Sequence, residues 1–327
     1  MKRLLFTALL ISVAVSSGYA KKKFAITSNG EALQALTQVT DNEEPCLYPF
    51  GGDNGTALFF CARENKRWYN IYKKDNPFSA AMTQKTSGKN LNYSPVYCAA
   101  TDKLAFRCQL EGSNTSDIYM MTDSKGKALN QITESSNAFE GSPSFSPDGT
   151  LLVYSKVQYS YYKSYNMWTS LFGGFNTVVV ANSEIWMKNV KTGETTLLGS
   201  GACPRFSPDG SKIAYVKYSS DAKSTSIWTM NTDGSDQIQI TDAKKGFALN
   251  PCWSPDGTKL AFQSSKKDKK DYDIYIIDVD GNNLVQVTIN KSYDGMPYWT
   301  SDNFLYFVSD RGNTEENLQI WRFKLNE

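Results

Sequence analysis

Short apolar stretches recur along the chain, separated by clusters of turn-forming residues. Some are continuously apolar, as at Leu260–Phe262 and Ile213–Tyr215, and indicate strands buried on both faces. Others alternate polar and apolar positions, as at Asp273–Ile277, and indicate half-buried strands. Between them lie turns such as Ser-Pro-Asp-Gly at 254–257, where proline fixes φ and glycine tolerates a positive φ. The pattern predicts an all-β fold with no helix after residue 20.

The chain also repeats itself. A proline, any residue, an aromatic residue and then Ser-Pro-Asp-Gly form a phrase whose prolines, weaker copies included, are Pro49, Pro95, Pro143, Pro204, Pro251 and Pro297. The intervals are 46, 48, 61, 47 and 46 residues, which defines six units. Repeats of this length are typical of solenoids and propellers.

Two further markers keep the same register. An isoleucine followed by an aromatic residue occurs at Ile71, Ile118, Ile185, Ile227, Ile274 and Ile320. A threonine that ends a short strand occurs at Thr40, Thr86, Thr133, Thr241 and Thr288, 9 or 10 residues before the next repeat proline. Each unit therefore contains four short strands, here called A to D, and the unit is typical of a β-propeller blade.

The two ends of the chain complement each other. Only 30 residues follow Pro297, enough for strands B and C but not D. Leu33–Thr40 resembles the D strands and has no A, B or C strand of its own. We therefore expect a six-bladed propeller of four-stranded antiparallel blades over residues 21–327, in which the N-terminal strand completes the last blade and leaves no open end.

Residues 1–20 have the features of a secretory leader. Lys2 and Arg3 precede an apolar run, and a small-residue cleavage site ends near Ala20. Its apolar run is too short to span a bilayer, and no later one is long enough, so we expect a periplasmic or secreted protein without a transmembrane segment. Removing the two basic residues of the leader from the total of 35 leaves 33 basic and 33 acidic residues. A neutral chain of this kind is not expected to bind nucleic acid.

Histidine is absent. This excludes Ser-His-Asp and Cys-His mechanisms and imidazole-ligated metal sites. Together with the lack of a Gly-x-Ser-x-Gly elbow, it leads us to expect a protein that is not an enzyme and holds no cofactor or metal. The aspartates of the repeated turns, Asp148, Asp209 and Asp256, are expected to bond turn amides rather than act in catalysis.

The repeat resembles that of the TolB-type propellers, which are built from WD40-like (PD40) repeats. The resemblance rests on Phe145–Gly149, Phe206–Gly210, Trp253–Gly257 and Ser309–Asn313, and it extends over all six units. It implies an exported binding protein. TolB carries an α/β domain before its propeller, and too few residues precede the first strand here for such a domain. The resemblance does not settle the activity, because one fold hosts several functions.

The third unit contains an insertion between strands B and C, Val157–Ser183. Its aromatic residues include Tyr161, Tyr162, Tyr165, Trp168, Phe172 and Phe175. Aromatic side chains on a loop that the blade does not need are candidates for partner binding. Packing onto neighbouring blades, plugging of the channel and stacking on a sugar remain alternatives. The insertion lies on the face of the B–C and D–A loops, which we predict to be the working face, since the opposite A–B turns are uniform.

On that working face, a further position recurs three residues before each repeat proline. It is predicted to rim the central channel, where Glu140 and Asp294 face each other from blades three and six. The alternatives are a bound cation or basic partner group, or two solvated carboxylates. Phe139, Phe247 and Tyr293 could form an apolar collar there. Arg311 is expected to pair with Asp310 or to reach across the blade.

Six cysteines would enter an oxidising compartment on export. Cys46 and Cys61, on neighbouring strands of blade one, are the first choice for a disulfide.

The leading interpretation is an exported, non-enzymatic propeller that binds a protein of the cell envelope. The alternative is a propeller that binds or acts on carbohydrate through carboxylates at the channel mouth; hydrolysis would need two of them close together.

Overall fold

The computed structural model describes residues 25–28, 31–32, 34–52, 56–124, 126, 129–158, 183–219, 224–242, 246–265, 272–289, 292–312 and 317–325. The proposed leader and residues 159–182 of the insertion lie outside these ranges. The described residues form β-strands and one short 3-10 turn, η2 (Ala99–Thr101), which agrees with the predicted all-β class.

Six four-stranded antiparallel sheets follow one another along the chain, numbered here as blades one to six. Blade one contains β4 (Cys46–Gly51), β5 (Leu58–Glu64), β6 (Trp68–Lys74) and β7 (Thr83–Gln84). Blade two contains β8 (Leu91–Cys98), β9 (Lys103–Gln109), β10 (Asp117–Thr122) and β11 (Asn130–Gln131). Blade three contains β12 (Ala138–Phe145), β13 (Leu151–Gln158), β14 (Ser183–Asn189) and β15 (Thr195–Ser200).

The second half repeats this order. Blade four contains β16 (Ala202–Phe206), β17 (Lys212–Tyr218), β18 (Thr225–Asn231) and β19 (Ile238–Gln239). Blade five contains β20 (Phe247–Trp253), β21 (Lys259–Ser265), β22 (Asp273–Asp278) and β23 (Val285–Gln286). Blade six contains β25 (Asp294–Trp299), β26 (Phe304–Ser309), β27 (Gln319–Lys324) and, from the other end of the chain, β3 (Gln34–Gln38).

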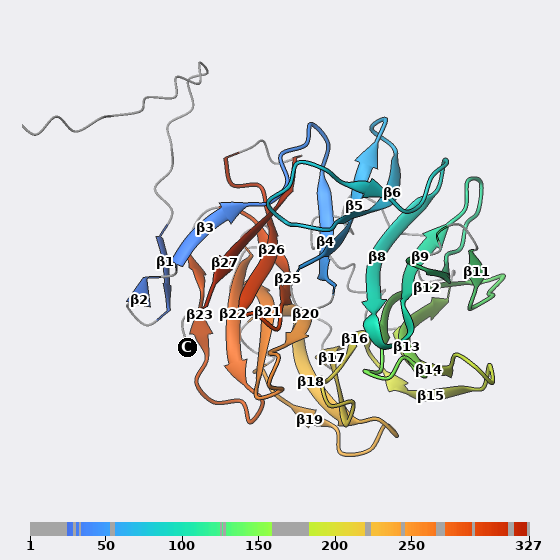
Figure 1. Cartoon of the computed structure of the whole chain (residues 1–327). Coiled ribbons are helices and arrows are strands. Elements are labelled where there is room, and N and C mark those ends of the chain that lie inside the picture. Colours follow the sequence, from blue (N-terminus) through green and yellow to red (C-terminus); the bar gives the residue numbers. More distant parts are fainter. Residues whose placement is uncertain are drawn as a thin grey trace, which may run out of the picture.

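The blades are arranged in a ring around a central axis (Figure 1). The A strands of neighbouring blades contact one another all the way round, and the last contact is between β25 and β4. At least one backbone hydrogen bond crosses each of the six seams between blades. For example, the Glu140 N–H donates to the Ser116 carbonyl and the Asp294 N–H to the Tyr272 carbonyl, each at 2.8 Å. The predicted six-bladed propeller is therefore confirmed.

Closure of the ring follows the predicted route. In β3, Gln38 pairs with Trp321 and Thr37 with Arg322 of β27, in antiparallel register. The N–H groups of Val39 and Thr40 continue the pairing by donating to the Ile320 carbonyl at 2.8 and 3.3 Å. The N-terminal strand thus covers the outer edge of the last blade, and β3 lies beside β27 in Figure 1.

A small sheet outside the ring was not predicted. It consists of β2 (Glu31–Ala32), β1 (Ala25–Ser28) and β24 (Thr288–Ile289), in that order. In the chain, β24 directly follows β23, the outer strand of blade five. Through β24, the strands β1 and β2 that precede β3 are attached next to blade five.

The core lies between the blades, and its repeating unit is a cross-strand aromatic pair. In every blade a buried aromatic residue of strand B is directly opposite the aromatic residue that follows the marker isoleucine of strand C. The pairs are Phe60–Tyr72, Phe106–Tyr119, Tyr154–Trp186, Tyr215–Trp228, Phe262–Tyr275 and Phe307–Trp321. Such pairs stabilise a sheet beyond the area that they bury.

The isoleucine and threonine markers prove to be two ends of one hydrogen bond. The Ile227 N–H of strand C donates to the Thr241 hydroxyl of strand D at 2.8 Å. The same bond forms at Ile71–Thr86, Ile118–Thr133, Ile274–Thr288 and Ile320–Thr40. Blade three lacks the threonine because its longer β15 pairs Ile185 with Gly199 through the backbone. The bond explains why the two markers share one register.

We expect Thr241→Val to lower the free energy of unfolding by about 1–3 kcal/mol, because the shape is kept while the buried Ile227 N–H loses its acceptor. Urea unfolding checks this. Thr195→Val, on the exposed edge of β15, is the matched control and should stay within about 0.5 kcal/mol of wild type. Equal effects of the two substitutions would contradict a role for the hydroxyl.

Candidate functional site

Each A strand contains a bulge at its repeat proline. The residue before the proline has a positive φ in all six blades, although it is never glycine: Tyr48, Ser94, Ser142, Cys203, Asn250 and Met296. The strand register shifts at the same place in every blade. Proline fits there because it lacks the N–H that a regular ladder would need. Bulges re-aim side chains.

At the A–B turn end of the channel the bulges surround a cavity of about 400 Å³. All six blades contribute to its wall. The aromatic residues that line it are Tyr48, Phe50, Tyr97, Phe145, Phe206, Trp253, Tyr298 and Trp299. Seven prolines, which hold the backbone in place, also line it: Pro49, Pro95, Pro147, Pro208, Pro251, Pro255 and Pro297. The cavity is on the face predicted to be scaffold, and not on the face predicted to bind.

Among the residues that the structure describes, Arg205 is the only charged side chain in the wall of this cavity. It lies one position after a repeat proline and is half-buried. Its Nη1 donates to the carbonyl oxygens of Pro143 and Pro204 at 2.9 and 3.3 Å. Among the described residues it forms no ion pair with an acid. Because a guanidinium has five N–H donors, Arg205 keeps hydrogen-bonding capacity for an anionic group in the cavity.

The backbone of Arg205 is fixed as well. Trp253 of blade five donates its indole N–H to the Arg205 carbonyl at 3.0 Å. Asn250, at the bulge of blade five, donates to Gln263 Oε1 at 2.8 Å. The charged group and the aromatic wall next to it are therefore positioned before any ligand binds.

Arg205 was missed in the sequence because the repeat was searched for its shared residues. The position after the repeat proline holds Phe50, Val96, Ser144, Cys252 and Tyr298 in the other blades. The indication of a functional role that the sequence did offer was that only one of these six equivalent positions holds a charged residue.

The predicted carboxylates do not rim a wet mouth. Glu140 and Asp294 are 2% and 0% exposed, because the position three residues before the proline forms the seam with the preceding blade. Glu140 Oε1 lies 2.9 Å from Lys156 Nζ within its own blade. The prediction of two solvated carboxylates facing each other across the channel is therefore wrong.

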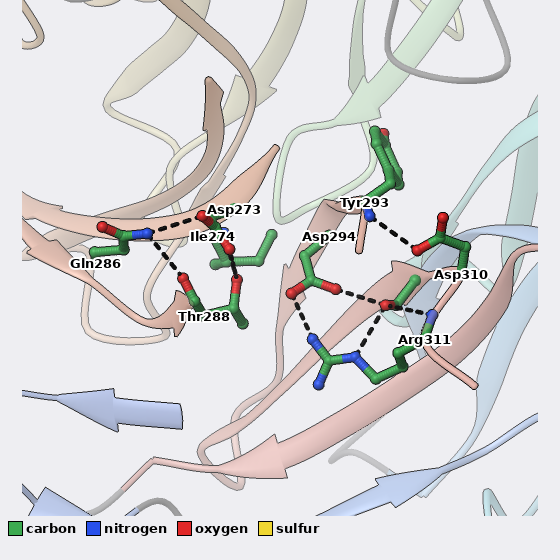
Figure 2. A network of polar contacts seen from close by, with 9 residues as sticks. Asp273, Ile274, Gln286, Thr288, Tyr293, Asp294, Asp310 and Arg311 are labelled. Atoms are coloured by element: carbon green, nitrogen blue, oxygen red, sulfur yellow. Dashed lines mark hydrogen bonds and ion pairs between the residues drawn. The ribbon is translucent and has the colours of Figure 1, made fainter. Parts of the chain in front are cut away.

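Arg311 pairs with Asp294, and the expected partner Asp310 is engaged elsewhere (Figure 2). Both side chains of the pair are fully buried. Ser309 links them: its hydroxyl donates to Asp294 Oδ1 at 2.6 Å and accepts from Arg311 Nε at 2.9 Å. Asp310 accepts instead from the Tyr293 N–H at 2.9 Å. The pair is a structural element of blade six.

The predicted aromatic collar is part of the core. Phe139 and Tyr293 are each 6% exposed, and Phe247 is half-buried. Tyr293 packs edge-on against Tyr272 across the seam between blades five and six, with the two ring centroids 5.8 Å apart. Burial raises the pKa of the Tyr293 hydroxyl. These rings pack inside the propeller rather than on its surface.

The predicted disulfide is absent. Cys46 and Cys61 are free, buried thiols, as are the other four cysteines. Cys46 is opposite Ala62, and Cys61 is opposite Leu47. Since side chains alternate along a strand, this offset of one residue puts the two sulfur atoms on opposite faces of the blade.

The repeated aspartates hold their turns, as expected. Asp209 Oδ1 accepts from the Ser207 hydroxyl at 2.6 Å and from the Ser211 N–H at 3.0 Å. These bonds lower the pKa of Asp209 to about 2. Asp148 and Asp256 make the same contacts in their own turns.

Two further predictions concern metal binding and membrane spans. Within the described ranges, no three Cys, Asp or Glu side chains come together as metal ligands would. No helix among the same residues is long and apolar enough to cross a bilayer.

The insertion residues Tyr161, Tyr162, Tyr165, Trp168, Phe172 and Phe175 lie outside the described residues, so their predicted role stays a prediction.

Solved structures with this fold include both TolB-type proteins and enzymes. A protein provisionally assigned as TolB from Agrobacterium tumefaciens is 18% identical, with a TM-score of 0.61 over 88% of this chain and 93% of that one. An oligogalacturonate lyase in complex with manganese is 17% identical, with a TM-score of 0.60 over 94% and 99%. A luciferin-regenerating enzyme is 11% identical, with a TM-score of 0.61 over 89% and 95%.

These similarities show the fold alone, and they correct one expectation. The prediction that the protein is not an enzyme is wrong as an inference, because enzymes share its fold as closely as the TolB-type protein does. No curated protein matches the chain in sequence. The model of the TolB β-propeller domain (PD40) matches residues 158–327, just over half of the chain, and the protein therefore belongs to the TolB β-propeller family.

Proposed function

We propose that the protein binds a segment of a partner protein at the channel mouth on the A–B turn face, with an anionic group of that segment on Arg205. The observation that carries the proposal is a single cation, without an acidic partner among the described residues, in a cavity of about 400 Å³ walled by aromatic rings. Family membership supports an interaction role in general.

The chemistry of the cavity favours this kind of ligand. Binding hot spots are enriched in tryptophan, tyrosine and arginine in sites that exclude water. Here Trp253 and Trp299 are buried within the wall, while Tyr298 and Phe145 are half-buried. An inserted carboxylate would gain a charge-assisted hydrogen bond to Arg205, and an adjacent apolar group would cover the rings. Little conformational freedom would be lost on binding, because prolines and cross-blade bonds already hold the wall in place.

The cellular setting is part of the same proposal. Residues 1–20 act as a cleaved leader, residues 21–327 form one domain, and the partner is a protein of the cell envelope. The aromatic insertion at 157–183, which joins β13 to β14 in the sequence, provides a second contact surface.

Arg205→Met is expected to weaken partner binding at least about tenfold, since a charge-assisted hydrogen bond contributes roughly 1.5–3 kcal/mol. The partner is first captured from envelope extract by the wild-type protein and identified, and its affinity is then measured by calorimetry. Lys191→Met removes the same charge from an exposed turn and should leave the affinity unchanged. Thermal unfolding of both variants checks that the ring is intact.

Two outcomes would reject the channel site. One is unchanged affinity in the folded Arg205→Met protein. The other is loss of binding only when residues 159–182 are replaced by a short Gly-Ser turn, which would assign the partner to the insertion instead.

An acidic carbohydrate is the second candidate ligand, because it would offer a carboxylate to Arg205 and apolar ring faces to the aromatic wall. The sequence predicted that a carbohydrate would bind through Glu140 and Asp294, but both of these side chains are buried. Calorimetry with oligogalacturonate and with a neutral oligosaccharide separates the two. Binding of the acidic sugar that is lost in Arg205→Met would favour this candidate over the protein partner.

A further inference from the structure

The seam between blades two and three brings two carboxyl groups together. Ser116 and Phe139 form a parallel bridge, and the residues that follow them are Asp117 of β10 and Glu140 of β12. The Glu140 N–H donates to the Ser116 carbonyl at 2.8 Å, and the Ser116 hydroxyl donates to the Glu140 carbonyl at 3.1 Å. The backbone therefore holds these two acids next to each other, at matching positions on the two sides of the seam.

One carboxylate oxygen at this seam has no donor. Glu140 is 2% exposed, and its Oε1 is paired with Lys156 Nζ at 2.9 Å. Its Oε2 is buried without a hydrogen-bond partner. Leaving a buried carboxylate oxygen unsatisfied is costly, and a hydrogen bond between two carboxyl groups needs a proton. A proton on Asp117 would supply the missing donor.

The remaining bonds of Asp117 leave room for that proton. Its Oδ1 accepts from the Ser135 N–H at 2.9 Å, whereas its Oδ2 accepts only from Gln131 Nε2, at 3.3 Å. Burial, and then the charge of Glu140, raises the pKa of Asp117 to about 6.

Other titratable and charged groups surround the two acids. They are Arg107 and Cys108 on β9, Tyr119 on β10, Glu134 before β12, Tyr154 and Lys156 on β13, and Glu184 on β14. Lys156 is the cation in direct contact with Glu140, and its presence beside the pair favours a proton over a metal ion as the second partner.

We propose that Asp117 and Glu140 share one proton across the seam, and that loss of this proton on going from acidic to neutral pH weakens the contact between blades two and three. The pair would make this seam sensitive to pH, close to the ends of β13 and β14 that the insertion connects. This inference is independent of the proposed ligand site, which lies at the other end of the channel.

The direction of the pH effect follows from proton linkage. The folded protein binds the proton at Asp117 more tightly than the unfolded chain, where the pKa is near the ordinary 3.8. Stability from this group is therefore fully present below about pH 4 and is lost as the pH rises through about 6. An asparagine at 117 would donate permanently to Glu140 and would not titrate.

Carboxyl-carbon NMR of protein labelled at aspartate tests the pair directly. The Asp117 carboxyl is expected to titrate near pH 6 in the wild-type protein and to move down towards 3.8 in Glu140→Gln. A midpoint at or below about pH 4 in the wild type would overturn the proposal.

Thermal unfolding at pH 4 and pH 7.5 provides the second measurement. Asp117→Asn should unfold at a higher temperature than wild type at pH 7.5 by several degrees, and at nearly the same temperature at pH 4. Glu194→Gln, an exposed carboxylate on blade three, should match wild type at both values. A shift of Asp117→Asn that is equal at both pH values, or a loss of stability confined to pH 7.5, would also overturn it.

Discussion

Asp294→Asn is expected to lower the free energy of unfolding by about 3–5 kcal/mol, the largest effect of any single substitution considered for this protein. The change removes the charge that Arg311 faces, while both side chains are fully buried. The guanidinium cannot lose its proton, so it would stay charged in a fully buried position after losing its ion-pair partner. The rings of Phe307 and Trp321, with centroids 4.7 and 5.6 Å from the guanidinium carbon, would compensate only in part.

A double-mutant cycle provides the sharpest test of this ion pair. Arg311→Met alone should be similarly destabilising, because it leaves Asp294 buried without its cation. Asp294→Asn combined with Arg311→Met should cost clearly less than the sum of the two, since no buried charge remains. Additive effects in urea unfolding would show that the two side chains do not depend on each other.

Removal of the closing strand is the second large effect that we expect. A chain that begins at Asp41 lacks β3 and should unfold at a temperature at least about 10 °C lower, or aggregate through the exposed edge of β27. The loss includes the Thr40 hydroxyl, which accepts from the Ile320 N–H at 2.9 Å. It also includes the Val39 carbonyl, which accepts from the buried Lys74 Nζ at 2.6 Å. Burial already lowers the pKa of Lys74, so loss of this acceptor would leave a poorly solvated amine.

The matched control is a chain that begins at Leu33. It lacks β1 and β2 but keeps the closing strand, and it should unfold close to the full chain. A synthetic peptide of residues 33–40 added to the shorter chain should restore part of the lost stability by strand addition. Equal stability of the two truncated chains would mean that the ring does not depend on β3.

The repeat could be predicted from the sequence because each of its markers has a local physical cause. The repeat prolines lie at bulges of the innermost strands, where a missing N–H costs nothing. The threonine and isoleucine markers are joined by one hydrogen bond in five blades. Counting strands was then sufficient to predict that Leu33–Thr40 belongs to blade six.

The candidate site was much less accessible from the sequence. Spacing placed Glu140 and Asp294 at equivalent positions correctly, but it could not show that this position forms a seam between blades. The pairing of Cys46 with Cys61 failed for a related reason, because a shift of one residue in strand register moves a side chain to the other face. Arg205 was visible only as an exception to the repeat.

The order of residues by itself determined the number of blades, the strand order within each blade and the closure of the ring, because these depend on local turns, strand patterns and chain length. Only the tertiary structure decided that a cavity lies at the A–B turn end of the channel and that Glu140 and Asp294 are buried in the seams. That outcome depends on how six bulged strands meet at one axis, and side chains from distant blades compete there for the same space. The position of Arg205, without an acidic partner among the residues that the structure describes, and the burial of the acids at the seams follow from that packing.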